Sequence, residues 1–196
     1  MHRTWNIVYF GGLICLIGIR HLYARQTLRN ELVVKRRDAV DKFSLLLVTA
    51  GSILTPLLYL FTPWLNFADY SLPPLVPWFG LGVMVVALWL FWRSHADLGQ
   101  NWSVTLAVRK DHQLITRGVY RSIRHPMYAS LWLWKLAQGL LLSNWLAGWF
   151  GLISFFPLYF YRTPREEEMM CEAFGPEYED YMRRTGRIVP RLKFQN

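Results

Sequence analysis

Two polar stretches of the chain carry the side chains best suited to chemistry. The first ends at His125-Pro126, with Tyr120 shortly before it and Tyr128 just after it. The residue before a proline favours extended backbone, and proline suits the first turn of a helix, so we predict that a helix begins at Pro126. The first N–H groups of such a helix lack internal partners. With the two tyrosines they predict a site for a polar ligand. The alternative is a loop that Tyr and Arg side chains anchor at an apolar interface.

The second polar stretch starts at Arg162 and continues through Pro164 to three consecutive glutamates, residues 166–168. We predict that a new helix begins at Pro164, with the glutamates in its first turn, where the helix dipole favours acids. The dipole explains the glutamates without any further function, but it does not explain Arg162. We expect Arg162 to lie next to the Pro126 turn once the apolar segment between them folds as a hairpin.

Beyond the glutamates, apolar and aromatic side chains recur at near-helical spacing from Met169 to Met182, with a break at Gly175-Pro176. This pattern predicts two short amphipathic helices that lie on a membrane interface. Packing explains the aromatic side chains better than direct contact with a ligand does.

Composition indicates which elements position these stretches. The chain has 196 residues, of which 53% are hydrophobic and 16% aromatic, yet its formal net charge is +9. Such an apolar content excludes an ordinary soluble basic domain and a disordered tail. The charges are segregated, because four long stretches carry no charged residue: 4–19, 43–66, 71–92 and 136–161. A helix needs roughly 20 apolar residues to cross a bilayer, so these stretches predict membrane spans.

We predict an all-α, polytopic integral membrane protein with about five transmembrane helices. The spans are expected near residues 4–22, 43–63, 73–92, 127–142 and 145–161. The last two form a tight hairpin with its turn at Ser143-Asn144. An uncleaved first span is preferred to a signal peptide, because no small-x-small cleavage pattern precedes Arg20. The single membrane-embedded domain covers 1–196, with catalytic segments at 93–126 and 162–196.

The basic residues predict the orientation of the spans. Lys and Arg number seven in residues 20–42, six in 93–124 and seven in 162–196, and none lies in the turns 64–71 and 143–145. By the positive-inside rule the three basic segments are cytoplasmic, with the N-terminus outside and the C-terminus cytoplasmic. We expect the cell membrane of a prokaryote or the endoplasmic reticulum of a eukaryote. Because topology explains the charge, nucleic acid is not an expected partner, and residue spacing predicts no metal site.

An ordered series of motifs follows the third predicted span. It consists of Gly118-Val-Tyr120, Arg124-His125-Pro126-Met-Tyr128, Arg162-x-x-x-Glu166-Glu167, Phe174-Gly175-x-x-Tyr178-x-x-Tyr181 and Pro190. The series resembles the isoprenylcysteine carboxyl methyltransferase family, whose wider group includes phospholipid methyltransferases, over roughly residues 95–191. The resemblance implies an integral-membrane enzyme that binds S-adenosylmethionine at the cytoplasmic end of its helices. In agreement, no strand–GxGxxG–helix unit of a Rossmann methyltransferase occurs.

The resemblance also implies roles for individual residues. Cofactor contacts are implied at His112, Leu114, Ile115, Tyr120, His125, Pro126, Met127, Tyr128 and Glu166, and polar residues in 100–105 are further candidates. Arg162 is implied to face the substrate. The catalytic candidates are Arg162, Glu166 and Glu167, where Glu167 is a possible base. A carboxylate acceptor needs no base, whereas an amine or a phenol would need one.

Physical chemistry agrees with this expectation. Transfer of a methyl group from a sulfonium cation to a carboxylate cancels two charges, so a site of low dielectric favours it. The faces of Tyr120 and Tyr128 could hold the sulfonium by cation–π contacts, worth about 0.5–2 kcal/mol each. The planar fork of Arg162 could orient the acceptor carboxylate. We expect a lipophilic, isoprenylcysteine-like or otherwise prenylated acceptor in the lipid bilayer.

Three alternatives stay open. They are a methyltransferase for phospholipid amines or another lipid such as a quinone precursor, a sterol-type membrane reductase that uses NADPH, and a small transporter. A transporter predicts polar residues around a cavity inside the spans. Here Lys135 is the one charge in the middle of a predicted span, accompanied by Asn6, Ser52, Thr55 and Gln138. Lys135 is expected to extend to the interface or to pair with a carboxylate.

Overall fold

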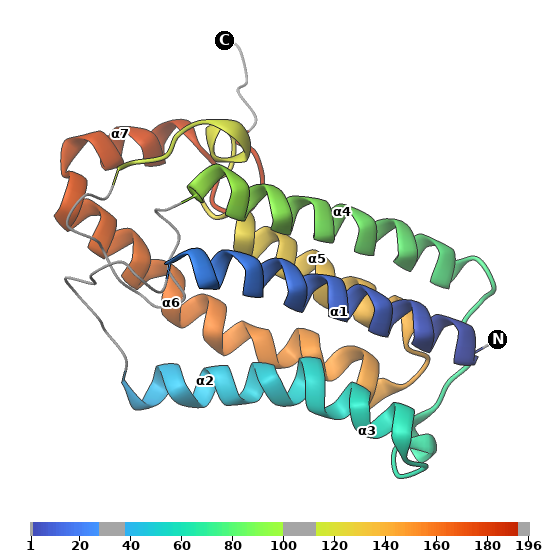
Figure 1. Ribbon diagram of the computed structural model, residues 1–196. Helices are drawn as coiled ribbons and strands as arrows, with labels where there is room; N and C mark the ends of the chain where they lie inside the picture. Colours follow the sequence, from blue (N-terminus) through green and yellow to red (C-terminus); the bar gives the residue numbers. More distant parts are fainter. Residues whose placement is uncertain (1, 28–37, 100–112, 192–196) are drawn as a thin grey trace.

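The computed structural model describes residues 2–27, 38–99 and 113–191 (Figure 1). Regular structure in these ranges is helical, so the predicted all-α class is confirmed. The longer helices are α1 (His2–Thr27), α2 (Ala39–Thr49), α3 (Thr55–Phe61), α4 (Val76–Leu98), α5 (Pro126–Leu141), α6 (Phe150–Phe174) and α7 (Pro176–Arg184). Short 3-10 or π-helical turns are η1 (Ala50–Leu54), η2 (Asn66–Ala68), η4 (Gly118–Arg121) and η5 (Trp145–Trp149).

Three helical stretches in the described residues are long and apolar enough to cross a membrane: Thr4–Arg25, Ala39–Phe61 and Val76–Leu98. Helix α5 is short for a membrane span, with 16 residues, and the second half of α6 is charged. The number of five spans is therefore approximate. Each predicted span coincides with helix, and the predicted turn at Ser143-Asn144 separates α5 from η5. The positions of the membrane boundaries stay a prediction.

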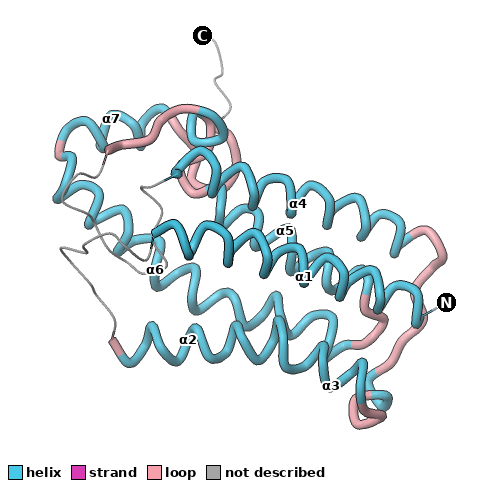
Figure 2. Tube along the Cα trace, in the orientation of Figure 1, coloured by secondary structure: helices cyan, strands magenta, loops and turns pink. Residues whose placement is uncertain are grey.

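The long helices run side by side as a bundle, with α7 and the η4 turn together at one end (Figures 1 and 2). Helix α4 packs along α5, α2 packs along α6, and α1 lies against α4. One core cluster fills the space between α1, α4 and α5, where Tyr9, Met84 and Trp134 are buried. A second cluster, around Tyr128 and Phe155, joins α5 to α6.

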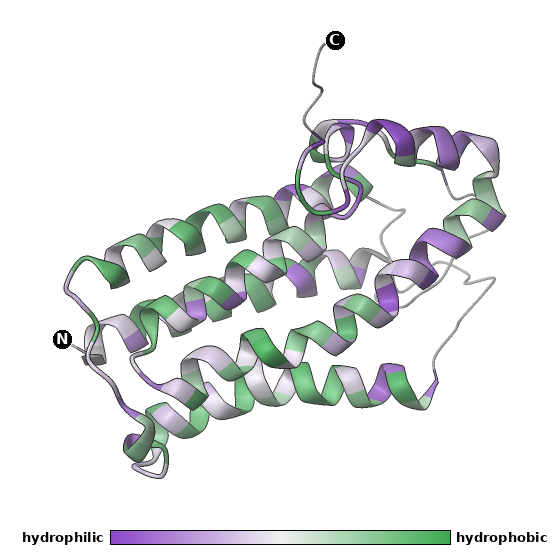
Figure 3. Ribbon diagram, turned by 180° about the vertical axis from the view of Figure 1, so that it is seen from behind, coloured by the Kyte–Doolittle hydropathy of each residue, from purple (hydrophilic) through white to green (hydrophobic). Residues whose placement is uncertain are grey.

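Hydropathy is segregated along the bundle. The colours in Figure 3 show hydrophobic residues along the long helices and hydrophilic residues at the end formed by α7 and the last turns of α6. Large apolar side chains such as Ile14, Phe43 and Phe160 are exposed on the outside of the bundle. An apolar outer surface of this kind fits contact with lipid rather than with water.

The second helical stretch contains a wide turn at η1, between α2 and α3. Gly51 in this turn lies against α6, where an added Cβ would come within 2.4 Å of Ser154 Oγ. The Gly51 carbonyl accepts a hydrogen bond from Gln138 Nε2 at 2.8 Å, and the Ser52 carbonyl accepts one from the Tyr9 hydroxyl at 3.0 Å. Because a π-turn disturbs the regular bonding of a helix, side chains from α1 and α5 satisfy carbonyls here and fix the position of η1.

The predicted start of a helix at Pro164 is wrong. Helix α6 continues unbroken through Pro157 and Pro164 to Phe174, so the glutamates lie in mid-helix and not in a first turn. A proline inside a helix loses one hydrogen bond and crowds the preceding turn. Burial of the apolar side chains of Phe155, Leu158 and Met169 on this helix acts against that cost. The break falls instead at Gly175, whose φ of +54° suits glycine, so only the second of the two predicted short helices, α7, is separate.

Candidate active site

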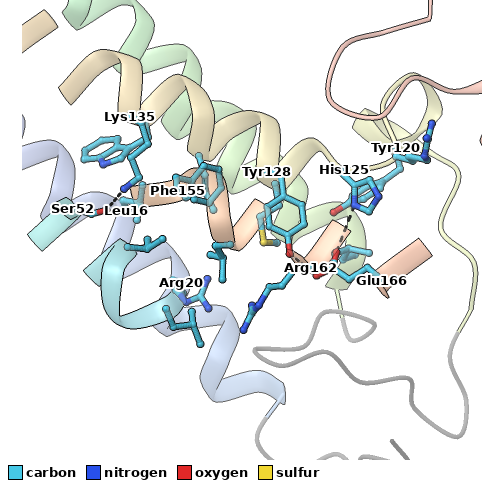
Figure 4. A pocket seen from close by; sticks show the side chains of 18 of the residues that line it. Leu16, Arg20, Ser52, Tyr120, His125, Tyr128, Lys135, Phe155, Arg162 and Glu166 are labelled. Atoms are coloured by element: carbon cyan, nitrogen blue, oxygen red, sulfur yellow. Dashed lines mark hydrogen bonds and ion pairs between the residues drawn. The ribbon is translucent and has the colours of Figure 1, made fainter. Parts of the chain in front are cut away.

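A cavity of about 450 Å³ lies inside the bundle, between α1, α2, α5 and α6, and extends to the residues beside η4 and α7. Its volume falls in the range of roughly 300–1,000 Å³ that is typical of small-molecule sites. One end is lined by polar and aromatic side chains, among them Tyr120, His125 and Glu166. The middle is mostly apolar but includes Arg20 of α1, and Lys135 and Ser52 lie at the far end, as Figure 4 shows.

The chain between η4 and α5 is held by backbone contacts to two other elements. Gly118 has φ of +60°, and an added Cβ would lie 2.1 Å from the carboxylate of Asp97 at the end of α4. The same carboxylate accepts a hydrogen bond from Val119 N at 2.9 Å. His125 N donates to the Arg187 carbonyl at 2.9 Å, beyond α7. The predicted ligand-binding turn is therefore fixed from both sides.

The tyrosines of this end are buried and hydrogen-bonded. Tyr120 donates to the Ser94 carbonyl at 3.3 Å, and Tyr181 of α7 donates to the Tyr120 carbonyl at 2.6 Å. Burial raises the pKa of Tyr120 well above its usual range, so this phenol stays neutral. Tyr178 and Tyr181 also line the cavity. They place α7 as one wall of the site.

His125 lies between the two glutamates of α6. Its Nε2 is 3.1 Å from Glu167 Oε1, and its Nδ1 is 3.6 Å from Glu166 Oε2. Burial acts against the charged imidazolium, but the hydrogen bonds and charges of the two glutamates outweigh it and raise the pKa of His125. The histidine is thus biased towards its cationic form.

Glu167, which is not among the residues that line the cavity, is the centre of an ion-pair cluster. Arg124 Nε lies 2.6 Å from its Oε1, and Arg187 Nη2 lies 2.5 Å from its Oε2. Burial would raise the pKa of Glu167, but His125 and the two arginines outweigh burial and hold that pKa well below its usual range. A carboxylate that is held so firmly in its anionic form is a weak base, and we interpret Glu167 as an anchor of the site.

Glu166, the neighbouring residue, lines the cavity. Its Oε1 accepts a hydrogen bond of 2.5 Å from the Tyr128 hydroxyl, and its side chain is 29% exposed. Tyr128 is itself held by aromatic contacts with Phe155 and Tyr159 of α6. Glu166 is therefore a positioned carboxylate with access to a ligand.

Arg162 forms a two-point ion pair that was not predicted. Its Nε and Nη2 lie 2.6 and 3.0 Å from the two carboxylate oxygens of Asp41, whose side chain is 1% exposed. Asp41 belongs to α2, and its place beside a long apolar stretch is the one sequence signal that could have identified it. Arg162 still lines the cavity, and Arg20 of α1 lines it as well (Figure 4). Arg20 lies outside the motif series, so sequence reasoning had no means to find it.

The cavity brings most of the predicted residues together. Those that line it are Leu114, Ile115, Tyr120, His125, Met127, Tyr128, Arg162 and Glu166. Pro126 begins α5 beside them. His112 and residues 100–105 lie outside the described residues. Within the described ranges no group of three or more His, Cys, Asp or Glu side chains could hold a metal ion.

Lys135 neither extends to the interface nor pairs with a carboxylate in the described parts of the chain. Its ammonium nitrogen donates to the Ser52 hydroxyl, and the residue is 2% exposed. Both side chains line the cavity. The two expectations for Lys135 were therefore wrong, because η1 brings a hydroxyl to it inside the bundle.

The helices form a bundle with an apolar outer surface, and its ligand-sized cavity opens among charged residues. Together these features define a small-molecule site inside a membrane-embedded protein. Residues 80–172 match the model of the isoprenylcysteine carboxyl methyltransferase (ICMT) family. Over these residues, just under half of its length, the chain is similar to that family, and its long apolar helices support an integral membrane protein.

Individual relatives show how far the similarity extends. The chain is 29% identical over 114 residues to protein-S-isoprenylcysteine O-methyltransferase of Schizosaccharomyces pombe, covering 57% of this chain and 48% of that protein. It is 25% identical over 199 residues to the Mus musculus enzyme of the same name, covering 97% and 67%. A solved structure of the eukaryotic intramembrane Ras methyltransferase ICMT superposes with a TM-score of 0.53 at 25% identity, covering 77% of this chain and 50% of that one. This chain spans about half the length of the fission-yeast relative and of the solved chain.

Proposed function

We propose that this protein is an S-adenosylmethionine-dependent methyltransferase that methylates the carboxylate of a lipophilic, isoprenylcysteine-like acceptor. One observation carries the proposal: Tyr120, His125, Tyr128 and Glu166, from separate parts of the motif series, line one end of a cavity whose remaining lining is mostly apolar. The names of the relatives support the carboxyl acceptor.

The residues at the polar end fit the cofactor. Bound there, S-adenosylmethionine supplies a methyl group on a sulfonium cation, which a carboxylate accepts without release of a proton. Glu166 would hold the cofactor's ammonium or hydroxyl groups by charge-assisted hydrogen bonds. The rings of Tyr120 and Tyr128 offer cation–π contact to the sulfonium. Leu114 and Ile115 offer apolar contact to the adenine ring.

Arg162 would orient the acceptor carboxylate. Asp41 engages Nε and Nη2 and so fixes the plane of the guanidinium. An arginine has five N–H donors, so donors remain for a second carboxylate. Because the acceptor loses no proton, the reaction needs no base, which agrees with the anchored state of Glu167.

The apolar wall would hold the lipid part of the acceptor and exclude water. Leu16, Leu131 and Leu158, from α1, α5 and α6, line the middle of the cavity. Exclusion of water strengthens the electrostatic interactions that favour a charge-cancelling transfer. Access from the bilayer would suit an acceptor that is itself dissolved in lipid.

We also propose that the charged end of the bundle is cytoplasmic and that the N-terminus lies outside. The basic segments support this orientation, and Figure 3 shows hydrophilic residues gathered at the α7 end. A C-terminal green fluorescent protein fusion should fluoresce, whereas a C-terminal alkaline phosphatase fusion should be inactive. The reverse pair of results would contradict the orientation.

The proposed activity is tested with purified protein in detergent. Titration calorimetry should show binding of S-adenosylmethionine and not of NADPH, and Glu166→Ala should weaken binding at least tenfold, because charge-assisted hydrogen bonds are worth roughly 1.5–3 kcal/mol. Glu168→Ala, two positions along and exposed, is the matched control. If Glu166→Ala binds normally, the role assigned to Glu166 is wrong.

The chemistry of the product separates the alternatives. Incubation with cofactor labelled in its methyl group and N-acetyl-S-farnesylcysteine should give label that mild base releases, as expected of an ester. Label that resists base would indicate methylation of an amine or a phenol. Binding of NADPH in place of S-adenosylmethionine would favour the reductase.

A further inference from the structure

The deep end of the cavity holds a second polar group that the proposed reaction does not use. Lys135 lies seven residues after Tyr128 on α5, about 10 Å along the axis and on the same face, because seven residues make almost two turns. Both residues line the cavity. Figure 4 shows Lys135 and Ser52 together at one end and His125 and Glu166 at the other.

The surroundings of Lys135 give its amine a single protein partner. Within the described ranges, Ser52 Oγ is the one hydrogen-bond acceptor for Nζ, and no carboxylate forms an ion pair with it. A protonated lysine has three N–H donors and a neutral one has two. Ionisable groups at this depth are costly and usually have a functional reason.

Neighbouring polar groups already perform the structural task that could explain this lysine. Tyr9 bonds the Ser52 carbonyl, and Gln138 bonds the carbonyls of Gly51 and Ala147. These contacts tie η1 to α1, α5 and η5 without Lys135. The lysine instead directs its amine at Ser52, and both residues line the cavity that the acceptor's lipid part would occupy.

A purely hydrocarbon tail would fit this end badly. It would cover an amine that keeps unsatisfied donors, and a buried donor without a partner is unfavourable. A tail that carries an oxygen at this depth would satisfy those donors. The apolar wall between the two polar ends, which includes Leu131 and Phe155, fixes the spacing of such an oxygen from the reacting carboxylate.

We propose that Lys135 and Ser52 form a binding subsite for a hydrogen-bond-accepting oxygen on the lipid part of the acceptor, about 10 Å from the reacting end of the cavity. The subsite selects oxygenated lipid acceptors over plain isoprenyl chains. The inference rests on the proposed function, because it takes the apolar part of the cavity to be the acceptor site.

The test compares farnesylcysteine with two oxygenated cysteine thioethers of equal chain length. One oxygenated acceptor carries a carbonyl and the other a carboxylate, each about 10 Å from the cysteine carboxylate, in line with the spacing of Tyr128 and Lys135 along α5. The wild type should show a kcat/KM at least about tenfold higher for an oxygenated acceptor, because a site built for a hydrogen bond rejects the analogue that lacks it. Preference for the carboxylate would indicate a charged lysine, and preference for the carbonyl a neutral donor.

Lys135→Met keeps an unbranched side chain and removes the donors. It should abolish the preference by lowering kcat/KM for the oxygenated acceptors to the value for farnesylcysteine. Leu136→Met, the next position on α5 and outside the cavity lining, should leave the preference unchanged. Ser52→Ala keeps the amine and should reduce the preference in part, so it tests the subsite even if Lys135→Met fails to fold.

The outcomes distinguish this inference from the proposed function. Equal methylation of all three acceptors by the wild type, with a ratio that Lys135→Met does not change, would overturn the subsite and leave the methyltransferase intact. Absence of methyl transfer to every carboxylate acceptor, despite correct folding, would overturn both.

Discussion

The two ends of the cavity differ in how their buried charged groups are compensated. At the charged end, Glu167 contacts Arg124, His125 and Arg187, with distances of 2.5–3.1 Å between charged atoms. At the deep end, the Lys135 amine meets a neutral hydroxyl, and the described residues provide no counter-charge. At the charged end, the protein's own charged groups neutralise one another. At the deep end, the amine of Lys135 keeps N–H donors that a ligand could use.

This difference indicates a division of tasks. The cluster around Glu167 joins the start of α5, the middle of α6 and the segment after α7, so it holds the walls of the proposed cofactor site in place. Preorganised groups lose little when a ligand binds or reacts. Lys135 contributes little to holding the helices together, so its value must lie in what it contacts when the site is used.

The largest effect on stability is expected at Glu167. Glu167→Ala leaves three cationic side chains around one vacated position, and loss of one partner from a buried ion-pair cluster costs about 3–5 kcal/mol. We expect a large drop in the free energy of unfolding, measured by denaturant titration in detergent, with loss of cofactor binding. Glu168→Ala, on the exposed side of α6, is the control and should change stability by less than about 0.5 kcal/mol. Equal effects of the two variants would contradict the anchoring role.

A second large effect is expected at Asp41, which positions Arg162. Asp41→Ala should lower kcat/KM for the carboxylate acceptor by about 100-fold, because small misplacements of an orienting group have effects of that size. The Kd for S-adenosylmethionine, measured by calorimetry, should change little. Lys42→Ala, at the exposed position next to Asp41 on α2, is the control and should be nearly silent. A variant of Asp41 that weakens cofactor binding as much as catalysis would show a structural role instead.

Stability should also depend on pH through this end of the molecule. Because the pKa of His125 is raised, its ion pairs stabilise the fold fully below its ordinary value of 6.5, and this stabilisation is lost as the pH rises through the raised value. Because the pKa of Glu167 is lowered, its contribution is complete above its ordinary value of 4.5 and is lost only as the pH falls through the lowered value. As the pH rises above 6.5, the Tm of the wild type should fall more steeply than that of His125→Gln. Parallel Tm curves would show that His125 does not titrate in this range.

The smallest effect on stability is expected at the deep end. Lys135→Met replaces an amine that has one neutral partner by an apolar side chain of similar length. We expect the free energy of unfolding to stay within about 1 kcal/mol of the wild type or to rise, since replacing a poorly compensated buried charge is often neutral or stabilising. A loss as large as that of Glu167→Ala would remove the contrast between the two ends.

Adjacent glutamates show why the sequence could not assign these roles. Glu166 and Glu167 belong to the same motif, and both were predicted as catalytic. Successive residues on a helix point about 100° apart, so one faces the cavity and the other faces the arginines. The rotation of α6 in the bundle decides which glutamate faces the cavity. That rotation could not be predicted while a helix was wrongly expected to start at Pro164.

Contacts between residues that are distant in sequence were the other feature that the sequence did not predict. Asp41 and Arg162 are 121 positions apart, and Lys135 and Ser52 are 83 positions apart. For each pair, the only local sign in the sequence is a single charged residue at the edge of an apolar stretch or inside it. The contacts arise because α2 packs along α6 and because the π-turn η1 is fixed opposite α5.

The sequence by itself determined the helices, the grouping of charge at one end and the family motifs, because hydropathy, charge and proline or glycine geometry act over a few residues. Helix rotation and packing across the bundle decided the rest. They separate the ligand-facing Glu166 from the anchoring Glu167, they give Arg162 its counter-charge, and they place Lys135 inside the cavity rather than at its edge.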